Sequence, residues 1–285
     1  MKQVTLSDHT GDQIRQAEAA RHAIYQRQQA IHQAAVQAIA ARRVSTRKSL
    51  ALAWQQRQFG RVVTGIVAVI GARLSKQPPE PVLQGAGRDE VVWATGHDGE
   101  QQLTGQLAGQ LGPDWIAFSG YRNRKGEVDL LVLGPYGLLG IEIKHVNGVI
   151  HGHGDTWTRD KIDRYGNLVE RGISLADRRG RGPSRQVNEA CAVLRDFLTR
   201  RQVTVPFLTA VVFTHERVRM GQIQSPTVAF VGEAAQLDVR ALLARQGAPQ
   251  LTPADVQRVA RLIEQDHAYH AKSAHEKQGQ VRQRA

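Results

Sequence analysis

Two neighbouring apolar segments, residues 128–133 and 138–144, constrain the fold of this chain more than any other feature. The turn-forming sequence Gly-Pro-Tyr-Gly separates them. Their length and apolar character predict two β-strands, and the short turn predicts that the strands pair antiparallel. Charged residues interrupt both segments, with Asp129 near the start of the first and Glu142 and Lys144 near the end of the second. Antiparallel pairing can therefore bring these three side chains together.

The charged residues of the two strands form a candidate catalytic site. Side chains alternate between the faces of a strand, so Glu142 and Lys144 share one face while Ile141 and Ile143 share the other. Two carboxylates and an ammonium in apolar strands are costly to desolvate unless they are paired or bound to a metal. Carboxylates suit Mg²⁺ or Mn²⁺, so Asp129 and Glu142 are expected metal ligands. The alternative is a solvated strand face with Asp129 in a surface turn.

Lys144 completes this candidate site. A metal ion at the two carboxylates could act on a phosphate group. The side chain of Lys144 could then orient the water that attacks the phosphorus, help to deprotonate that water, or offset negative charge in the transition state. These three roles remain open at the level of the sequence.

Apolar periodicity after residue 86 predicts helices that alternate with strands. The expected helices are residues 98–111, 183–198, 234–245 and 253–269, and the further strands are residues 115–119, 207–213 and 227–231. Asp98, Pro183 and Thr252 are expected to begin three of these helices. Cys191 is the only cysteine and is expected in the core. This order predicts an α/β fold in which helices flank a mixed sheet.

The chain is expected to divide into three parts. Residues 1–85 form a basic helical arm and a linker, residues 86–270 form the core with its C-terminal helices, and residues 271–285 form a disordered tail. The division rests on composition, because the first part is rich in Ala, Gln and Arg and the alternation of strands and helices begins only after it.

The arm has an unusual charge pattern. Between Glu18 and Glu80 there are ten Lys or Arg residues and no Asp or Glu. A long helix is expected over residues 10–58, with Ile24 and Ile31 on a shared face. Two compatible interpretations remain open, a hairpin that packs on the rest of the protein and a basic arm that follows a phosphate backbone. The second interpretation assigns nucleic-acid contacts to Arg42, Arg43, Arg47 and Lys48.

The overall charge favours a polyanionic partner. Thirty-eight Lys and Arg against 26 Asp and Glu give a formal net charge of +12, so nucleic acid is the expected partner, and DNA more than RNA. The longest apolar run, residues 62–72, is too short to span a bilayer, so no membrane partner is expected. The polar first twenty residues do not resemble a signal peptide, which favours a cytoplasmic, bacterial-type protein.

Six short motifs occur in a fixed order along the chain. They are Gly99-Glu100, Gly126-Glu127-Val128-Asp129, Ile141-Glu142-Ile143-Lys144, Gly148, Trp157 and Gln186. In this order they resemble the nuclease-related domain (NERD) family, a branch of the PD-(D/E)XK nuclease superfamily. Two departures are Val128 at the position of the superfamily's proline and Gly182-Pro183 in place of the family's usual Asn-Pro.

The resemblance implies a restriction-endonuclease-like fold and a Mg²⁺- or Mn²⁺-dependent nuclease. By the same resemblance, Asp129 and Glu142 would be the metal ligands and Lys144 the catalytic lysine. Glu100 would assist metal or water binding, and Gln186 would orient a water or contact a phosphate. On local grounds alone, Glu100 could instead stabilise a helix start, and Gln186 could be a boundary residue.

Two further groups are weaker candidates. Four arginines before and within the expected helix 183–198 could guide a nucleic-acid backbone, or could form an ordinary solvated loop. They are Arg178, Arg179, Arg181 and Arg185. His151 and His153 could form a metal-binding pair, although no third ligand is evident.

Three functions are therefore carried forward. The first is a metal-dependent nuclease that acts on DNA. The second is a catalytically silent nucleic-acid-binding or scaffolding module on a nuclease fold. The third is a homo-oligomer assembled through the N-terminal helices, in which the nuclease-like core is structural.

Overall fold

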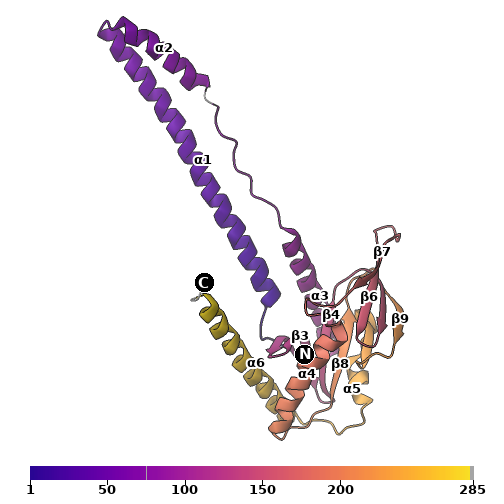
Figure 1. Ribbon diagram of the computed structural model, residues 1–285. Coiled ribbons are helices and arrows are strands. Elements are labelled where there is room, and N and C mark those ends of the chain that lie inside the picture. Colours follow the sequence, from indigo (N-terminus) through magenta and orange to yellow (C-terminus); the bar gives the residue numbers. More distant parts are fainter. Residues whose placement is uncertain (75, 283–285) are drawn as a thin grey trace. The chain divides into compact units, whose positions relative to one another are not determined.

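The computed structural model describes residues 1–74 and 76–282, and the chain divides into two compact units (Figure 1). The core unit contains Met1–Asp12 and Val92–Ala285, and the helical unit contains Gln13–Val91. This division differs from the one expected from composition, since the first twelve residues belong to the core unit. The reason is strand β1 (Lys2–Thr5), which pairs in parallel with the edge of the central sheet.

A six-stranded mixed sheet is the centre of the core unit. Its strands are β1, β2 (Ile116–Asn123), β3 (Gly126–Gly134), β4 (Gly137–Lys144), β8 (Phe207–Phe213) and β10 (Phe230–Glu233), in that spatial order. The antiparallel pairing of β3 with β4 is confirmed, with Leu130 opposite Ile141. Strand β8 then pairs in parallel with β4, and β10 in parallel with β8. The predicted α/β fold on a mixed sheet is therefore confirmed.

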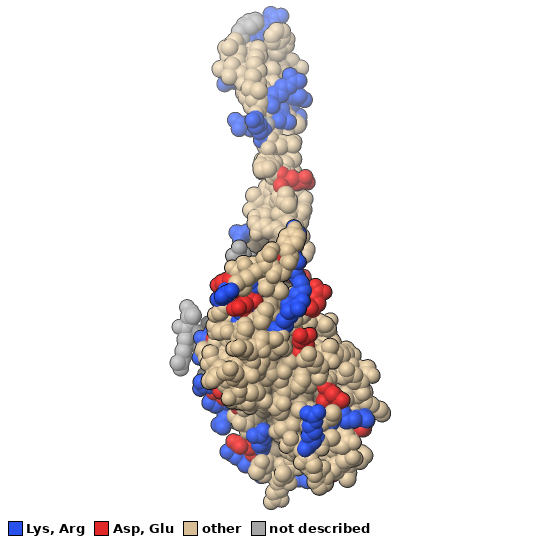
Figure 2. Space-filling view, turned by 90° about the vertical axis from the view of Figure 1, so that its right-hand side faces the viewer, with Lys and Arg blue, Asp and Glu red and all other residues tan. Residues whose placement is uncertain are grey.

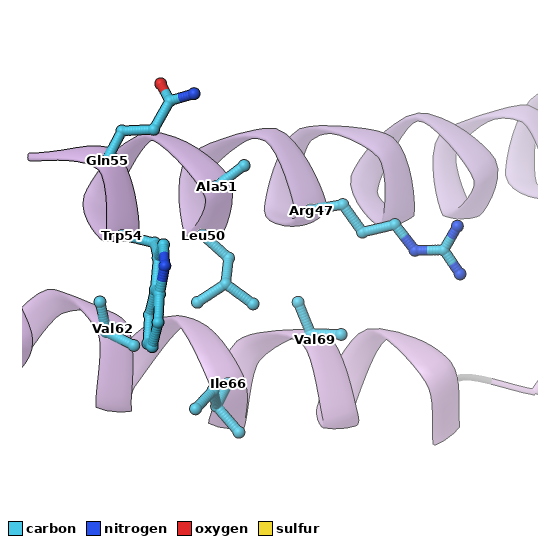
Figure 3. Close-up of a pocket in the computed structure, with 8 residues that line it drawn as sticks. All are labelled: Arg47, Leu50, Ala51, Trp54, Gln55, Val62, Ile66 and Val69. Carbon is cyan, nitrogen blue, oxygen red and sulfur yellow. The ribbon is translucent and has the colours of Figure 1, made fainter.

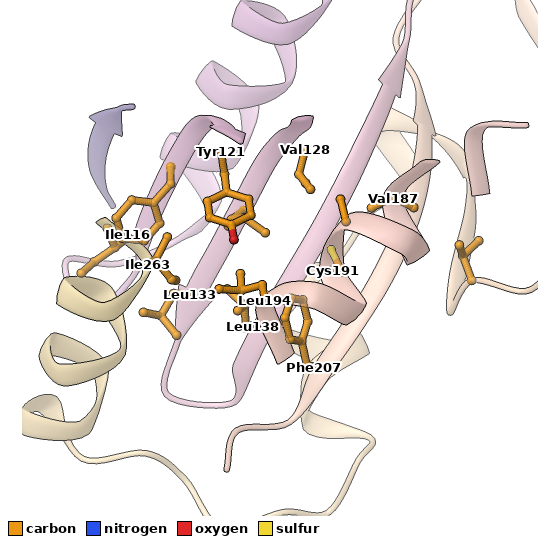
Figure 4. Close-up of a cluster of buried hydrophobic side chains, with 14 of the residues drawn as sticks. Ile116, Tyr121, Val128, Leu133, Leu138, Val187, Cys191, Leu194, Phe207 and Ile263 are labelled. Carbon is orange, nitrogen blue, oxygen red and sulfur yellow. The ribbon is translucent and has the colours of Figure 1, made fainter. Parts of the chain in front are cut away.

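Helices cover both faces of this sheet. On one face, α4 (Pro183–Arg200) and α6 (Pro253–Arg282) pack over apolar residues of the strands (Figure 4). On the other face, α3 (Arg88–Gln110) and the short helix α5 (Val239–Ala244) cover a second apolar layer. Cys191 is buried in α4, as expected, and a Cβ atom on Gly140 of β4 would lie 2.3 Å from its sulfur. The helix can approach β4 this closely because residue 140 is glycine.

A second sheet of four strands was not predicted. Its spatial order is β7 (Leu168–Ser174), β6 (Thr156–Ile162), β5 (Gly148–His153) and β9 (Val218–Gln224). Most side chains of β7 are exposed, so the strand has little of the apolar alternation that reveals a strand in sequence. Trp157 of β6 is buried, and its indole N–H donates to the Ser184 hydroxyl at the start of α4 (2.8 Å). The motif tryptophan therefore joins the second sheet to the core.

Several predicted helix boundaries were wrong. Helix α3 begins ten residues before Asp98, and its first turn holds Asp89 and Glu90, which favour a helix N-terminus. Helix α5 is shorter than predicted because a 3₁₀ turn, Ala234–Gln236, precedes it. The predicted disordered tail is wrong over residues 271–282, where α6 continues, while residues 283–285 lie outside the described part.

Two predicted helix starts are confirmed. Pro183 is at the first position of α4. At the start of α6, the Thr252 hydroxyl accepts from the backbone N–H of Asp255 (3.2 Å), and the Asp255 carboxylate accepts from the backbone N–H of Thr252 (3.1 Å). This reciprocal pair satisfies two N–H groups that the helix itself leaves unpaired.

The helical unit is a hairpin of α1 (His9–Gln55, in this unit from residue 13) and α2 (Phe59–Leu74). The Arg43 side chain on α1 donates to the carbonyl of Ala72 near the end of α2 (2.9 Å). Between the helices, a Cβ atom on Gly65 would lie 2.9 Å from Leu50, so glycine permits their close approach. Within residues 1–74 and 76–282, no helix combines the length and apolar character that crossing a membrane requires.

The expected packing face of α1 is not buried. Ile24 is 58% exposed and Ile31 is 62% exposed. Among the described residues of the helical unit, therefore, no neighbour buries this face at these two positions. The excess of Lys and Arg over Asp and Glu in this unit is a property of its sequence and does not depend on how the helix packs.

Candidate active site

The strands β3 and β4 stop pairing at the point where the predicted charged residues begin. The last paired residues before this point are Leu130 and Ile141. Beyond them, the carboxylate of Asp129 accepts a hydrogen bond from the backbone N–H of Ile143 (2.7 Å). The carboxylate thus takes the place of the backbone carbonyl that would otherwise accept from this N–H group in a paired strand. The hydrogen bond also holds the carboxylate against β4.

Glu142 and Lys144 form a close ion pair on the same face of β4. The Lys144 Nζ atom lies 2.5 Å from Oε1 of Glu142. The Glu142 side chain is 4% exposed and the Lys144 side chain 25% exposed. The alternative of a solvated strand face is therefore wrong. Burial lowers the pKa of Lys144, but the charges of Glu142 and Asp129 outweigh it and raise this pKa above its ordinary value. The lysine is therefore an ammonium at neutral pH.

Gly99 allows helix α3 to approach the ends of β4 and β8. A Cβ atom at this position would lie 2.6 Å from the Thr214 hydroxyl and 2.8 Å from Cβ of His145. Neither distance is sterically allowed, so a larger residue would push the helix away. Glu100 follows directly and is carried toward the site by this approach. The Gly-Glu motif lies in the middle of α3 and does not open the helix, which corrects the expectation.

Three acidic residues, Glu100, Asp129 and Glu142, influence one another and are called here the carboxylate cluster. Burial raises the pKa of Glu100 to about 7, and the negative charges of Glu127, Asp8 and Glu142 add to the effect. Burial also raises the pKa of Asp129 well above its usual value, followed by the charge of Glu142. Mutual repulsion of this kind marks a place where a cation would be favourable.

The donor set of the cluster suits a hard divalent cation. Mg²⁺ usually binds one or two carboxylates and completes its shell with water and substrate phosphate. Asp129 and Glu142 offer such oxygens, and burial first and then the charge of Glu142 raise the pKa of Asp129, so a cation would stabilise its ionised form. Among the described residues, no three or more His, Cys, Asp or Glu side chains form a ready-made cage for a metal. Carboxylate oxygens supplemented by water therefore fit better than a closed all-protein site.

Two histidines at the same edge were missed by the sequence analysis. The rings of His145 and His215 lie 4.9 Å apart between centroids, and Nδ1 of His145 is 2.9 Å from the Thr214 hydroxyl. Burial lowers the pKa of both imidazoles, so both are neutral at pH 7. A signal was present in the sequence. His145 follows Lys144 and His215 closely follows a predicted strand, and carboxyl ends of neighbouring parallel strands meet at one edge.

Gln186 and two of the predicted arginines are engaged within the loop and helix that carry them. The Gln186 side chain donates to the carbonyl of Arg181 (2.8 Å). Arg181 pairs with Asp177 (2.7 Å) and Glu189 (3.4 Å), and Arg185 also pairs with Glu189 (2.8 Å). These contacts hold the loop before α4 in shape. They show a structural part for Gln186 and Arg181 beside any role toward a substrate.

The remaining predicted basic residues divide between the two units. Arg178 and Arg179 are exposed in the loop of the core unit, and Arg42, Arg47 and Lys48 are exposed on α1 of the helical unit. Arg43 is half-buried by its bond to α2. The exposed side chains can reach a polyanion, whereas the side chain of Arg43 links the two helices of the hairpin.

The candidate metal pair of His151 and His153 gains no further ligand. Nδ1 of His151 accepts from the backbone N–H of Gln222 (3.3 Å), and Nε2 lies 3.8 Å from Asp160. The part of the chain that the structure describes contains no group of three metal-ligating side chains here. A polar contact between β5, β6 and β9 accounts for His151.

Comparison with known proteins agrees with the motifs. Residues 95–214 match the family model of the nuclease-related domain. No curated protein and no solved structure showed significant similarity to the chain. The matched segment runs from within α3 to just past β8 and includes the whole carboxylate cluster together with Lys144. The resemblance expected from the sequence is therefore confirmed over residues 95–214, which are similar to the nuclease-related domain.

Proposed function

We propose that the core unit is a metal-dependent nuclease that hydrolyses phosphodiester bonds in DNA at the site formed by Asp129, Glu142 and Lys144. The observation that carries the proposal is the ion pair between the buried Glu142 and the part-buried Lys144, beside the carboxylate of Asp129. A buried ion pair is weak support for stability, because well-packed apolar residues of similar size often serve a fold as well or better. A chemical role gives the trio a reason to be present.

Asp129 and Glu142 would hold Mg²⁺, or Mn²⁺ in its place. When bound, the ion supplies neutralisation of the charge on the scissile phosphate. Lys144 would donate to a phosphate oxygen, where negative charge grows in the transition state. Its raised pKa favours this role, or the orientation of the attacking water, over deprotonation of that water.

Glu100 is the best-matched proton acceptor of the site. Its pKa of about 7 lets the carboxylate accept a proton from water near neutral pH. The water oxygen forms a bond to phosphorus, the bond from phosphorus to the departing sugar oxygen breaks, and the departing oxygen takes a proton from solvent. Glu100 later returns its proton to solvent.

The substrate assignment rests on charge. The net charge of +12 and the exposed Arg178 and Arg179 favour a phosphate backbone. Arg185, Arg181 and Gln186 would support this loop as it meets the substrate. DNA is proposed ahead of RNA, with RNA kept as an arm of the assay.

A second function is favoured by a specific observation. Lys144 pairs with Glu142, and the N–H of Ile143 donates to Asp129, so both carboxylates have partners within the protein without any cation. A catalytically silent domain that binds nucleic acid would have such a self-contained pair. It would bind DNA with strong salt dependence and release no product.

A cleavage assay separates these functions. The full chain is incubated with supercoiled, linear and single-stranded DNA and with RNA, in Mg²⁺, in Mn²⁺ and in EDTA. We expect cleavage that needs the metal and is lost in Asp129→Asn, Glu142→Gln and Lys144→Ala. Glu170→Gln, which changes an exposed carboxylate on β7, is the matched control and should cleave normally. Cleavage that survives all three site variants would overturn the assignment, and salt-sensitive binding without product would favour the silent domain.

A further inference from the structure

Helix α2 exposes a continuous apolar stripe. Five large aliphatic residues at helical spacing lie on one face, with exposed fractions from 46% to 74%. This apolar stripe consists of Val63, Ile66, Val67, Ile70 and Leu74. Scattered exposed aliphatic residues are ordinary on protein surfaces, but a contiguous row of five is not.

The apolar stripe is not the interface of the hairpin. Val62 and Ala72 are buried and lie on the face of α2 that packs on α1. Figure 3 shows Val62 and Val69 pointing toward α1, while Ile66 lies at the edge of the same pocket and is 46% exposed. Helix α2 therefore has two apolar faces, and α1 covers only one of them.

Cationic residues surround this apolar surface. Eight of the ten Lys and Arg residues of the acid-free segment lie within residues 42–76. Arg57 and Arg61 flank the first end of α2, and Arg73 and Lys76 flank the other. On the helical unit, Figure 2 shows patches of Lys and Arg beside uncharged surface. The partner of the stripe must therefore accept apolar side chains and carry negative charge.

An apolar stripe surrounded by cations favours some binding partners over others. A second copy of the chain would bring eight further cations of the same segment against these eight without an acidic residue to pair them, which is repulsive. DNA would satisfy the cations but gives five aliphatic side chains no apolar surface to enter. An anionic lipid bilayer satisfies both, because its headgroups bind the cations and its acyl region accepts the stripe.

The dimensions of α2 fit a helix that lies in the bilayer surface. Sixteen residues span roughly 24 Å at 1.5 Å per residue, less than a hydrocarbon core of about 30 Å. The arginines at both ends can keep their charges among the headgroups while their stems lie along the acyl boundary. Trp54, 69% exposed beside the turn of the hairpin, has the amphipathic ring that favours such an interface.

We propose that the tip of the helical hairpin, formed by the apolar stripe of α2 with Trp54 and the surrounding Lys and Arg residues, docks on the surface of membranes that contain anionic lipids. The docking is peripheral and reversible. It does not depend on the nuclease proposal, since the residues belong to the other unit. It reassigns Arg42, Arg47 and Lys48 from DNA to lipid headgroups.

Co-sedimentation of the full chain with vesicles tests the proposal. The vesicles contain phosphatidylcholine alone or phosphatidylcholine with phosphatidylglycerol, at low and high salt. We expect at least tenfold tighter binding to the anionic vesicles, weakened by salt, with a blue shift of tryptophan emission as Trp54 leaves water. Trp115 and Trp157 are already buried and should not contribute to that shift, and the half-buried Trp93 is replaced by Phe in the protein used for this measurement.

Paired variants separate the apolar and ionic parts. The double change Val67→Gln with Ile70→Gln should weaken binding to the anionic vesicles at least tenfold. The triple change of Arg57, Arg61 and Arg73 to Gln should weaken it by a similar factor. The matched control is Leu168→Gln with Val169→Gln, which removes two exposed aliphatic residues from β7 of the core unit and should bind normally. Circular dichroism of each variant verifies that the helices remain.

Other outcomes overturn the proposal. Equal binding to neutral and anionic vesicles would show that the Lys and Arg residues do not select anionic lipids, which contradicts the proposal. Absence of vesicle binding, together with dimers in sedimentation that the α2 glutamine pair disrupts, would assign the stripe to a second copy. Absence of vesicle binding, together with DNA affinity that falls in the same pair, would assign it to nucleic acid.

Discussion

The two units of this protein break the usual distribution of residues in opposite ways. The core unit buries charge, since Glu142 is 3% exposed within a strand whose other residues, apart from Lys144, are apolar. The helical unit exposes apolar surface, since Val67 and Ile70 are more than half exposed on a helix surrounded by cations. Natural sequences tend to depart from local rules where function requires it. Each departure therefore points to a different activity.

The departures differ in how they are compensated. In the core unit the charges compensate one another, because Lys144 pairs with Glu142 and Ile143 donates to Asp129. In the helical unit α1 leaves the apolar stripe exposed. The first arrangement is completed by contacts within its own unit, whereas the second leaves an apolar face for which we propose a membrane as the partner. The predictions below test this difference through stability and activity.

The largest effect is expected at the Glu142–Lys144 pair. Glu142→Ala leaves the part-buried ammonium of Lys144 without its ion-pair partner, which should cost about 3–5 kcal/mol of unfolding free energy. The double change Glu142→Leu with Lys144→Met replaces both charges by apolar groups and should restore most of that stability. Denaturant unfolding measures both variants, and the cleavage assay should find both inactive.

That outcome would separate the chemical role of the pair from any structural one. A double variant as unstable as the single one would mean that the fold itself needs the charges. The single observation on which the nuclease proposal rests would then lose its force.

The second effect concerns an apolar residue of the core unit. Leu103 of α3 is fully buried against the sheet, so Leu103→Ala should cost about 2–5 kcal/mol. It also lies one turn after Gly99 and Glu100, so a loosened helix should reduce cleavage further. Thermal unfolding and the cleavage assay measure the two effects. Leu168→Ala, at a half-exposed residue of β7, is the control and should change neither.

The sequence predicted those parts of the fold that local pattern determines. Strands β3, β4 and β8 lie within about two residues of their predicted bounds, because they are apolar runs bounded by turns. The pairing of Asp129 with the end of β4 also followed from the short turn between two strands. Alternation, turn length and one acid in each strand were sufficient for the centre of the site.

The parts that the sequence missed depend on contacts between distant segments. His145 and His215 meet because β4 and β8 pair in parallel, which no local pattern reveals. Strand β7 of the second sheet is mostly exposed and lacks apolar alternation. The apolar stripe was overlooked for a related reason, since helical periodicity shows that residues share a face but not whether a neighbour covers it. A helix that lies on a membrane surface, moreover, need not be long and apolar enough to cross the membrane.

The third prediction uses the titration of Glu100. Its pKa rises from 4.5 to about 7 on folding, so the folded state favours the protonated form. The stability that this provides is complete below about pH 4.5 and is lost as the pH rises through 7. Glu100→Gln, which stays neutral, should therefore be more stable than the wild type at pH 8, by on the order of 1 kcal/mol after solvent screening. The difference should vanish at pH 4.5.

Unfolding curves at several pH values measure this difference without metal. Added Mg²⁺ should reduce it, because a bound cation lowers the cost of ionised carboxylates in the cluster. Asp163→Asn is a suitable control, since that carboxylate is exposed and hydrogen bonds lower its pKa. A gain in stability that is the same at pH 4.5 and pH 8 would show that ionisation of Glu100 is not its cause.

The smallest effect is expected at the apolar stripe. Val67 and Ile70 keep more than half of their surface in water after folding, so replacing both by Gln should change the unfolding free energy by no more than about 0.5 kcal/mol per site. Val62, which is buried against α1 in the same helix, should by contrast cost about 1–3 kcal/mol when replaced by Gln. Chemical denaturation followed by circular dichroism compares the three positions. Large losses at all three would mean that the stripe is already covered within the protein, and the opposition between the two units would disappear. Small losses at Val67 and Ile70 alone would mean that the hairpin keeps a face whose only stabilising contacts lie outside the chain.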